Sequence, residues 1–353
     1  MIVKPASSTF VLAAVLTLAP QLTGQSRRCA DAIGMFHEKR WSEASAAFDR
    51  CEKADPGKTD ALLYQAKALV NLRQYHDAAV ILQVYARSHP SSDDAAYLLA
   101  YISFREDKPR ESLQLFTAAA KLKPPGANDL TIVALDYVLL NDYNDAARYL
   151  ELALKMDPED LEARYHLGRV RYQQNQFDAA IDAFQHVLER DPANLKAQEN
   201  LALSFEARNQ IDAAIAAYRK AIDLDQALRS HSDQPYLDFG SLLAKSNRIG
   251  EAIPLLVRAS EIAPQDPKVR YELAKAYFDS GQFAAARKQA EEATRLNPND
   301  SSGHYLLGRI YQRLAQKQLA NQQFQLTSRL LHDKDVNSRQ PMASDAAPPL
   351  AKP

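Results

Sequence analysis

The apolar residues between positions 157 and 194 fall on two successive helical faces. Gly168 and Tyr172 share one side of a first amphipathic segment, and Ala180 and Phe184 share one side of a second. Each pair is spaced by four residues, which places both members on the same face of an α-helix. The pattern therefore predicts a hairpin of two helices in this stretch.

Asp-Pro pairs bracket this hairpin. One stands at 157–158 and another at 191–192, while Asn175 and Gln176 separate the two apolar segments. Proline lacks an amide donor and biases the preceding residue away from the helical region, so each pair is expected to end one hairpin before the next begins. Asn175 and Gln176 mark the turn inside the hairpin.

The same spacing recurs along most of the chain. Prolines follow one another at one constant interval at Pro56, Pro90, Pro124, Pro158 and Pro192. With a four-residue insertion before Asp233, the place of Gly168 is always small: Ala32, Ala66, Ala100, Ala134, Ala202, Gly240, Ala274 and Gly308. The place of Ala180 is also small: Ala44, Ala78, Ser112, Ala146, Ala214, Ala252, Ala286 and Ala320. Small residues at both places let the two helix backbones of a hairpin approach closely.

The place of Phe184 is large and apolar in all copies but one. Its counterparts are Phe48, Leu82, Phe116, Leu150, Tyr218, Leu256 and Phe324, and Ala290 is the truncated member. These side chains are expected to fill the space beside the small residues.

The small residue, the aromatic and the closing proline recur at fixed offsets and resemble the tetratricopeptide repeat family, whose repeat spans about 34 residues. Nine copies fit: 25–58, 59–92, 93–126, 127–160, 161–194, 195–228, 233–266, 267–300 and 301–334. Local departures are Asp31 and Gln65 in place of leucine, Arg171 in place of an aromatic, and Gln226 and His332 in place of proline. The resemblance implies an all-α fold, a superhelical solenoid of about nine helical hairpins.

The resemblance also implies a concave groove, lined by the first helix of each hairpin, that holds a peptide or protein partner. Residues expected to line it are Tyr97, Tyr101, Phe104, Arg105, Tyr165, His166, Arg169, Tyr172, Lys268, Tyr271, Lys275, Phe278, Tyr305, Arg309 and Arg313. Aromatic and basic side chains together favour an extended, partly acidic peptide. Several of these tyrosines fall where the family also uses aromatics to pack neighbouring first helices, so both roles stay open.

One ligand mode of the family is not reproduced. The carboxylate clamp needs lysine, asparagine and arginine at set places in three successive copies. Asn200 fits it, but Tyr165 and Gln234 occupy two of its companion places. A receptor for chaperone tails is therefore disfavoured.

The segment Met1–Gly24 differs from the rest of the chain. Lys4 is its only charge, and an apolar run extends over 10–19. The run has the length of a signal-peptide core and is shorter than the roughly 20 residues of a membrane-spanning helix. We expect a signal peptide cleaved after Gly24, hence an exported protein of the periplasm or the medium without a stable membrane anchor. An N-terminal helix packing on the solenoid is the alternative.

Both cysteines of the chain lie in the first copy. Cys29 is on its first helix and Cys51 on its second, and the hairpin geometry should bring them close. In an oxidising compartment we expect a disulfide that holds the terminal repeat; two buried thiols are the alternative.

Three features interrupt or end the array. Residues 227–232 form an insertion, and the missing proline at Gln226 predicts that the helix before it continues by a turn. The glutamine-rich second helix of the last copy is typical of a polar cap. We expect residues 335–353 to form a disordered tail, since they are rich in proline and poor in large apolar residues.

Composition and motifs favour a scaffold over an enzyme. The formal net charge is −1 without a basic stripe, which gives no reason to expect nucleic-acid binding. The eight histidines are scattered, and no metal, phosphate-loop, cofactor or nucleophile signature appears. We therefore expect a non-catalytic protein-interaction scaffold of the cell envelope, without cofactors. The alternative is an envelope-processing enzyme with a site improvised in the groove.

Overall fold

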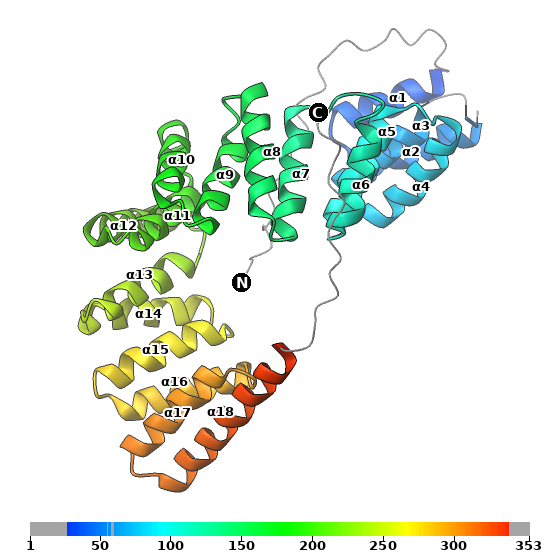
Figure 1. Cartoon of the computed structure of the whole chain (residues 1–353). Helices are drawn as coiled ribbons and strands as arrows, with labels where there is room; N and C mark the ends of the chain where they lie inside the picture. The colour runs from blue at the N-terminus through cyan, green and yellow to red at the C-terminus, as the bar shows by residue number, and fades with distance from the viewer. Residues whose placement is uncertain (1–26, 55, 58–59, 339–353) are drawn as a thin grey trace. The chain divides into compact units, whose positions relative to one another are not determined.

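The computed structural model describes residues 27–54, 56–57 and 60–338, and these residues are helical without strands. The chain divides into two compact units, Met1–Pro125 and Gly126–Pro349, which are described separately (Figure 1). The predicted signal segment 1–24 and the end of the predicted tail, 339–353, lie outside the described residues. The predicted all-α fold is confirmed.

Unit 1 contains three helical hairpins. Their helices are α1 (Arg27–His37), α2 (Trp41–Ala54), α3 (Ala61–Asn71), α4 (Tyr75–Ser88), α5 (Asp93–Arg105) and α6 (Pro109–Ala119). Consecutive helices contact one another from α1 to α6, and each hairpin packs on the next.

Unit 2 contains six hairpins. The first six helices are α7 (Ala127–Leu139), α8 (Tyr143–Met156), α9 (Leu161–Gln173), α10 (Phe177–Arg190), α11 (Leu195–Ala207) and α12 (Ile211–Leu228). The last six are α13 (Gln234–Lys245), α14 (Ile249–Ile262), α15 (Pro267–Asp279), α16 (Phe283–Leu296), α17 (Ser301–Arg313) and α18 (Lys317–Ser338). They follow one another as a single stack, green to red in Figure 1.

The turns inside the hairpins repeat one backbone conformation. Each contains one residue with φ between 59° and 78°: Lys39, Arg73, Asp107, Asn141, Asn175, Asn209, Asn247, Gly281 and Ala315. These positions are one repeat length apart, except for the one interval that contains the insertion. The period read from the side chains is thus also a period of the backbone.

The junctions between hairpins begin and end where the Asp-Pro pairs predict. Helix α8 ends before Asp157, and α9 begins after Asp160. The Asp160 carboxylate accepts hydrogen bonds from the amides of Glu162 and Ala163 at 2.9 and 3.0 Å. Such a cap satisfies amide donors that have no partner within the helix.

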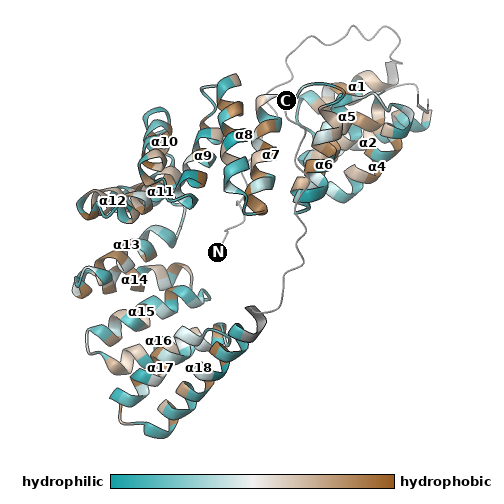
Figure 2. Cartoon of the chain, in the orientation of Figure 1, coloured by the Kyte–Doolittle hydropathy of each residue, from teal (hydrophilic) through white to brown (hydrophobic). Residues whose placement is uncertain are grey.

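Each hairpin closes over the small residues of its first helix. A Cβ atom added at Gly168 would lie 2.8 Å from Phe184, and one at Gly308 would lie 2.6 Å from Phe324. In another copy the hydroxyl of Ser112 donates a 3.0 Å hydrogen bond to the carbonyl of Ala100, joining the two small places directly. Hydrophobic and hydrophilic residues are interspersed along the helices (Figure 2).

First helices also contact the first helices of neighbouring hairpins. In unit 2, α9 meets α11, α11 meets α13, α13 meets α15 and α15 meets α17, whereas no pair of neighbouring second helices makes a comparable contact among the described residues. The side on which neighbouring helices lie closer is the inner side of a curved stack. First helices therefore line the inner side of unit 2.

The insertion lengthens α12 as the missing proline predicts. This helix reaches Leu228 and ends at Arg229, whose φ is 50°. The buried carboxylate of Asp225 accepts hydrogen bonds from the Ser232 amide at 2.8 Å and from the Tyr236 hydroxyl at 3.3 Å, and it also bonds the Ser230 hydroxyl. Asp225 thus fixes the inserted loop against α13.

Helix α18 is longer than its predicted repeat. It continues to Ser338, four residues past the predicted boundary at 334. Because 335–338 carry no glycine or proline, nothing in their sequence stops the helix. The helical part of the predicted tail therefore ends at Ser338.

Candidate functional site: the first-helix face of unit 2

The predicted partner-binding residues are divided between the two units. Tyr97, Tyr101, Phe104 and Arg105 are in unit 1, on α5, and the others are in unit 2. In unit 1 the Tyr97 hydroxyl donates a 2.6 Å hydrogen bond to the carbonyl of Lys123. Arg105 donates to the Tyr101 hydroxyl at 2.7 Å and lies 4.9 Å from the centre of the Tyr75 ring. These side chains join α5 to α4 and to the end of its own hairpin.

In unit 2 the side chains on the exposed side of α9, α11, α13, α15 and α17 form what we call the first-helix face. It carries Tyr165, Arg169, Tyr172, Glu199, Glu206, Asp238, Lys245, Lys268, Tyr271, Lys275, Tyr305, Arg309 and Arg313. Two contacts join neighbouring first helices on this face: Asn200 on α11 donates to the Tyr165 hydroxyl at 3.3 Å, and Lys245 on α13 donates to Glu206 at 2.9 Å.

The predicted residues of α9 are mainly packing residues. The Tyr165 ring lies 5.8 Å from the ring of Phe184, and Arg169 lies 5.9 Å from the Tyr165 ring centre. Burial raises the pKa of the Tyr165 hydroxyl. His166 is only 8% exposed, so its ring is not available to a partner in this structure.

The predicted residues of α17 are open to solvent. Tyr305 is 53% exposed, and Arg309 and Arg313 are exposed as well. The guanidinium of Arg309 lies 4.7 Å from the ring centre of Phe278, and that of Arg313 lies 4.9 Å from the ring centre of Phe283. Ring stacking holds both cations in place while their donors remain free to bind a carboxylate.

The α15 residues lie between these two groups. Tyr271 is half-buried, and burial followed by the charge of Glu272 raises its pKa. Lys268 is exposed, with its amine 3.9 Å from the carboxylate of Asp238 on α13. Lys275 is half-buried and belongs to none of the ion pairs found among the described residues.

Three carboxylates on the same face were missed in the sequence. Glu199 and Glu206 lie on α11, and Asp238 lies on α13. The signal was available, because Glu199 and Glu206 stand one repeat length after Tyr165 and Tyr172. They occupy the same places in the next repeat and therefore the same face.

These carboxylates are crowded. Burial, followed by the negative charges of Asp238, Asp225 and Asp233, raises the pKa of Glu199 to about 7, although a hydrogen bond from Ser232 opposes the shift. Burial also raises the pKa of Asp238, and the charge of Glu206 adds to that effect. A carboxylate that is both desolvated and near like charges is less stable in its ionised form.

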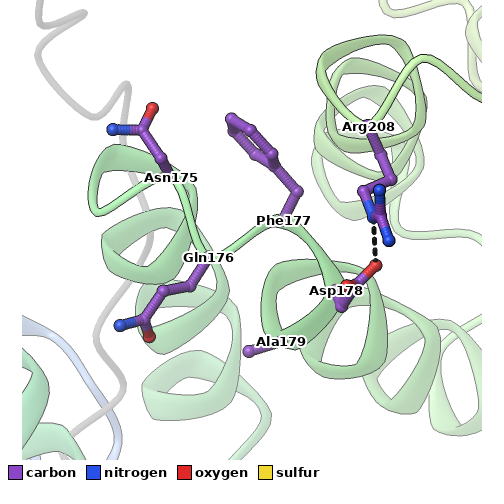
Figure 3. Close-up of a pocket in the computed structure, with 6 residues that line it drawn as sticks. All are labelled: Asn175, Gln176, Phe177, Asp178, Ala179 and Arg208. Carbon is purple, nitrogen blue, oxygen red and sulfur yellow. Dashed lines mark hydrogen bonds and ion pairs between the residues drawn. The ribbon is translucent and has the colours of Figure 1, made fainter.

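Two cavities lie away from the first-helix face. In unit 2 a cavity of about 480 Å³ at the turn between α9 and α10 is lined by Asn175, Gln176, Phe177, Asp178, Ala179 and Arg208 (Figure 3). The Arg208 guanidinium donates a 2.8 Å hydrogen bond to the Asp178 carboxylate there. In unit 1 a cavity of about 500 Å³ lies between α2 and α4, beside Leu62, Val84 and Tyr85. Neither cavity contains a predicted partner-binding residue.

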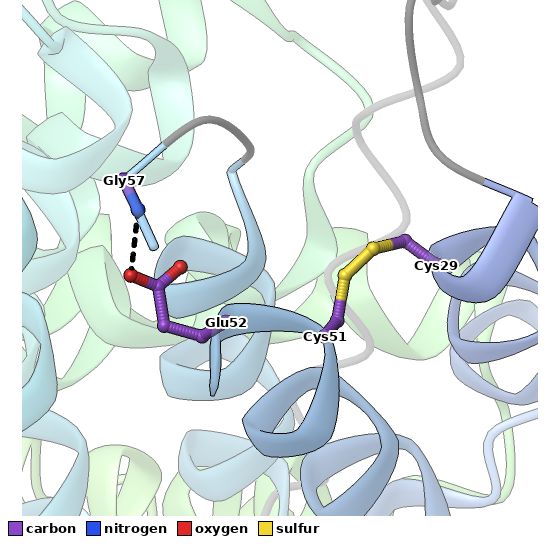
Figure 4. The surroundings of a disulfide bond; sticks show 4 residues. All are labelled: Cys29, Cys51, Glu52 and Gly57. Atoms are coloured by element: carbon purple, nitrogen blue, oxygen red, sulfur yellow. Dashed lines mark hydrogen bonds between the residues drawn. A yellow bond between two sulfur atoms is a disulfide. The ribbon is translucent and has the colours of Figure 1, made fainter. Parts of the chain in front are cut away.

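Cys29 and Cys51 form a disulfide in unit 1. It joins α1 to α2, with the two Cα atoms 5.6 Å apart and both side chains buried (Figure 4). The cysteines also belong to the apolar cluster that contains Phe48 and Ala61. The bond thus ties the first helix of the array to its core.

Membrane-spanning helices and metal-binding clusters are absent from the described ranges. No helix between residues 27 and 338, leaving out 55 and 58–59, is long and apolar enough to cross a bilayer. The same residues contain no group of three or more His, Cys, Asp or Glu side chains placed to hold a metal ion.

The architecture defines a class, that of proteins built from stacked helical hairpins. Two family models, both described as tetratricopeptide repeat, match the sequence, one over residues 243–310 and the other over 63–127, 134–194 and 167–229. The chain belongs to the tetratricopeptide repeat family. Proteins of this family generally serve as non-catalytic protein-interaction scaffolds.

Relatives of known identity match only part of their own length. The BBSome complex member BBS4 of Bos taurus is 34% identical over 104 residues, which cover 30% of this chain and 20% of that protein. The TPR repeat-containing thioredoxin TTL4 of Arabidopsis thaliana is 31% identical over 81 residues, which cover 23% of this chain and 12% of that protein. Each match therefore extends over about a fifth of the relative or less.

A solved structure supports the fold. The crystal structure of the APC/C hetero-tetramer Cut9–Hcn1 is similar with a TM-score of 0.56 at 15% identity, covering 79% of this chain and 54% of that one. At this identity the similarity extends to the fold alone.

Proposed function

We propose that this chain is an exported scaffold of the cell envelope or periplasm, and that it holds a peptide or protein partner on the first-helix face of unit 2. The observation that carries the proposal is the surface of α17. There an exposed tyrosine, Tyr305, lies beside two arginines that stack on rings and join no ion pair among the described residues. Exposed aromatic and arginine side chains are the residues that most often dominate binding at protein interfaces.

Export is supported separately. The apolar run over 10–19 and the cysteine pair Cys29 and Cys51 both fit a protein that leaves the cytoplasm. Expression of the full chain in a bacterium, followed by cell fractionation and N-terminal sequencing of the product, tests this part. We expect a mature protein that begins at Gln25, and an intact N-terminus in the cytoplasmic fraction would contradict it.

The binding proposal is tested by comparing two sets of three alanine substitutions. One set removes Arg169, Arg309 and Arg313 from the first-helix face. The control set removes exposed cations of the second helices: Arg219, Lys220 and Lys288. Crosslinking in the native envelope first identifies a partner, and titration of that purified partner then measures its affinity.

We expect the first set to weaken partner binding by about ten-fold or more, since hot-spot arginines each contribute more than about 1 kcal/mol. The control set should bind like the parent, and both sets should keep the parent's helicity and melting temperature. Equal affinity of the first set and the parent would place the partner on another surface. Turnover of a hydrolase substrate panel would favour the enzyme alternative, for which the described residues give no specific support.

A further inference from the structure

The first-helix face of unit 2 carries two regions of opposite charge. The acidic region consists of Glu199, Glu206 and Asp238 on α11 and α13. The basic region consists of Lys275 on α15 with Arg309 and Arg313 on α17. The basic and aromatic side chains taken alone predict a partly acidic partner.

The acidic region is only partly neutralised. Glu206 accepts a 2.9 Å hydrogen bond from Lys245, and it also accepts a 3.0 Å bond from the Tyr218 hydroxyl. The Asp238 side chain is 12% exposed; it accepts a 2.7 Å hydrogen bond from the Gln234 amide, and the amine of Lys268 lies 3.9 Å away. Glu199 has no ion pair among the described residues; it accepts a hydrogen bond from the hydroxyl of Ser232 at 3.3 Å.

The like charges in this region raise the pKa values of Glu199 and Asp238 after burial, as described above. A cation placed between these two carboxylates would stabilise their ionised forms. The acidic region is therefore a better site for a lysine or arginine of a partner than for another carboxylate.

The basic region has no carboxylate partner within residues 60–338. Arg309 and Arg313 lie over the rings of Phe278 and Phe283. No carboxylate of the described residues forms an ion pair with Arg309, Arg313 or Lys275. An anionic group of a partner would meet donors that are already oriented by ring stacking.

The helices set the distance between the two regions. From α13 to α17 is two steps between neighbouring first helices, and from α11 to α17 it is three, since each of these helices contacts the next. Packed helices lie about 8–10 Å apart, so the acidic region and the α17 arginines are separated by roughly 16–30 Å. An extended chain covers the middle of this range, about 20–25 Å, with about six or seven residues, since each spans at most about 3.3–3.6 Å.

We propose that the first-helix face of unit 2 binds an extended peptide that carries a basic group and an acidic group about six residues apart. The basic group lies on Glu199 and Asp238, and the acidic group lies on Arg309 and Arg313. A uniformly acidic peptide would place like charges against the acidic region, and a uniformly basic one would do so at α17. This inference rests on the proposed function and specifies the chemistry of the partner.

Three fluorescein-labelled peptides of equal composition test the charge order by fluorescence anisotropy. The first has two arginines, six serine or alanine residues and two glutamates in that order. The second has the four charges alternating at its centre, and the third separates the two charge pairs by a single residue. The full-length mature chain is titrated at low and at high salt.

We expect the first peptide to bind about ten-fold more tightly than either of the others, because only this peptide can place both of its charge pairs on their complementary regions at once. The difference should shrink at high salt. Equal affinities for the three peptides, or no saturable binding of the first, would overturn the proposed charge order.

Substitutions in the chain assign each contact. Glu199→Gln with Asp238→Asn removes the acidic region, and Arg309→Gln with Arg313→Gln removes the basic region. Each pair of substitutions should lower the affinity of the chain for the first peptide by about three- to ten-fold. The effect of the first pair should disappear when the peptide's arginines are replaced by glutamine but persist when its glutamates are replaced. The second pair should show the reverse dependence.

The two proposals fail in different ways. If the arginine-to-alanine set weakens the native partner while the three peptides bind alike, the charge order is wrong and the first-helix face remains the binding surface. If that set leaves the native partner's affinity unchanged, the proposed function is wrong. A third result is that the substitutions in the chain and in the peptide have effects on affinity that simply add in every combination. That result would show that the assigned groups do not contact one another, and it would overturn the charge order.

Discussion

The two terminal hairpins among the described residues each have a neighbouring hairpin on one side only, and they are stabilised differently. The hairpin α1–α2 has a described neighbour only after it, and α17–α18 has one only before it. A terminal repeat buries one side less than an inner repeat and opens more easily. The first hairpin is closed by a covalent bond, whereas the last presents a polar second helix.

The first hairpin combines its disulfide with an aromatic cluster. Phe36 lies 5.0 Å from Trp41 and 5.4 Å from Tyr64, and Phe48 stacks on Tyr64 at 5.5 Å between ring centres. Tyr64 belongs to α3, so the cluster also attaches the first hairpin to the second. The short helix α1, with 11 residues, thus depends on a bond and on aromatic contacts beyond its own hairpin.

The last hairpin has a buried polar contact between its two helices in addition to its apolar core. The buried His304 ring on α17 bonds through Nδ1 with Gln323 Oε1 of α18 at 2.7 Å and through Nε2 with the Pro298 carbonyl at 2.9 Å. Gln322 and Gln325 are exposed on the same helix. Helix α18 has 22 residues, and its polar surface needs no further repeat to cover it. One terminal hairpin is thus stabilised by a disulfide, and the other has a second helix whose outer surface is polar.

Removal of the disulfide should have the largest effect. Replacing Cys29 and Cys51 with alanine opens a loop of 22 residues, which should destabilise the first hairpin by about 3 kcal/mol in the chain-entropy model. Amide hydrogen exchange should accelerate in α1 and α2 and stay unchanged in α17 and α18. A reductant should accelerate this exchange in the parent protein and leave the exchange of the double alanine variant unchanged. Two free thiols in protein isolated from an oxidising compartment would contradict this prediction.

A methyl group added at Gly308 should have the next largest effect. The new Cβ would lie 2.6 Å from Phe324, so Gly308→Ala should destabilise α17–α18 by roughly 1–3 kcal/mol through overpacking. The matched control at the other end is Gly34→Ala. Nothing lies within 4 Å of a Cβ there, and alanine inside a helix should stabilise α1 by about 0.5–1 kcal/mol. Thermal unfolding and hydrogen exchange measure the stability change of each variant. Stability changes of the same sign for Gly308→Ala and Gly34→Ala would contradict the packing described.

The polar contact between α17 and α18 should contribute a smaller amount. Gln323→Ala leaves the buried Nδ1 of His304 without its partner, which should destabilise the last hairpin by about 1 kcal/mol. Gln322→Ala, at an exposed position of the same helix, is the control and should change stability by less than about 0.5 kcal/mol. Indistinguishable hydrogen exchange of the two variants would show that this contact does not hold the end.

The turns of the two ends should respond least. Ala315 has a φ of 60° and Lys39 a φ of 59°, a conformation in which glycine avoids the strain of a Cβ atom. Ala315→Gly and Lys39→Gly should each raise the melting temperature slightly, by the equivalent of about 0.5 kcal/mol, after the entropy lost by glycine is included. A lower melting temperature for either variant would show that its side chain stabilises the turn by contacts that outweigh the strain.

Most of the fold could be predicted because its determinants are local and repeated. The spacing of Gly168 and Phe184 predicted the seam of one hairpin, and the structure places these two residues against each other. The missing proline at Gln226 predicted the extension of α12 to Leu228. Interactions within one hairpin involve residues less than one repeat length apart, so one repeat of sequence contains both partners.

The candidate site could be predicted only in part. The repeat period identified the face that carries Tyr305, Arg309 and Arg313, because residues at equal places in successive repeats point the same way. It could equally have found Glu199 and Glu206 from the places of Tyr165 and Tyr172. It did not show that His166 is buried, since adjacent helical positions such as Tyr165 and His166 differ by a rotation of about 100°.

The sequence by itself determined the number of hairpins, their turns and the small residues that close them. Only the tertiary structure decided which charges are neutralised. Arg171 pairs with Glu151 of the preceding repeat and Lys245 pairs with Glu206. Arg309 and Arg313 instead lie on aromatic rings, and neither has an ion pair in the part of the chain that the structure describes. The physical reason is that a salt bridge needs two side-chain ends within about 4 Å. That distance depends on how one hairpin packs on the next, which no single repeat of the sequence specifies.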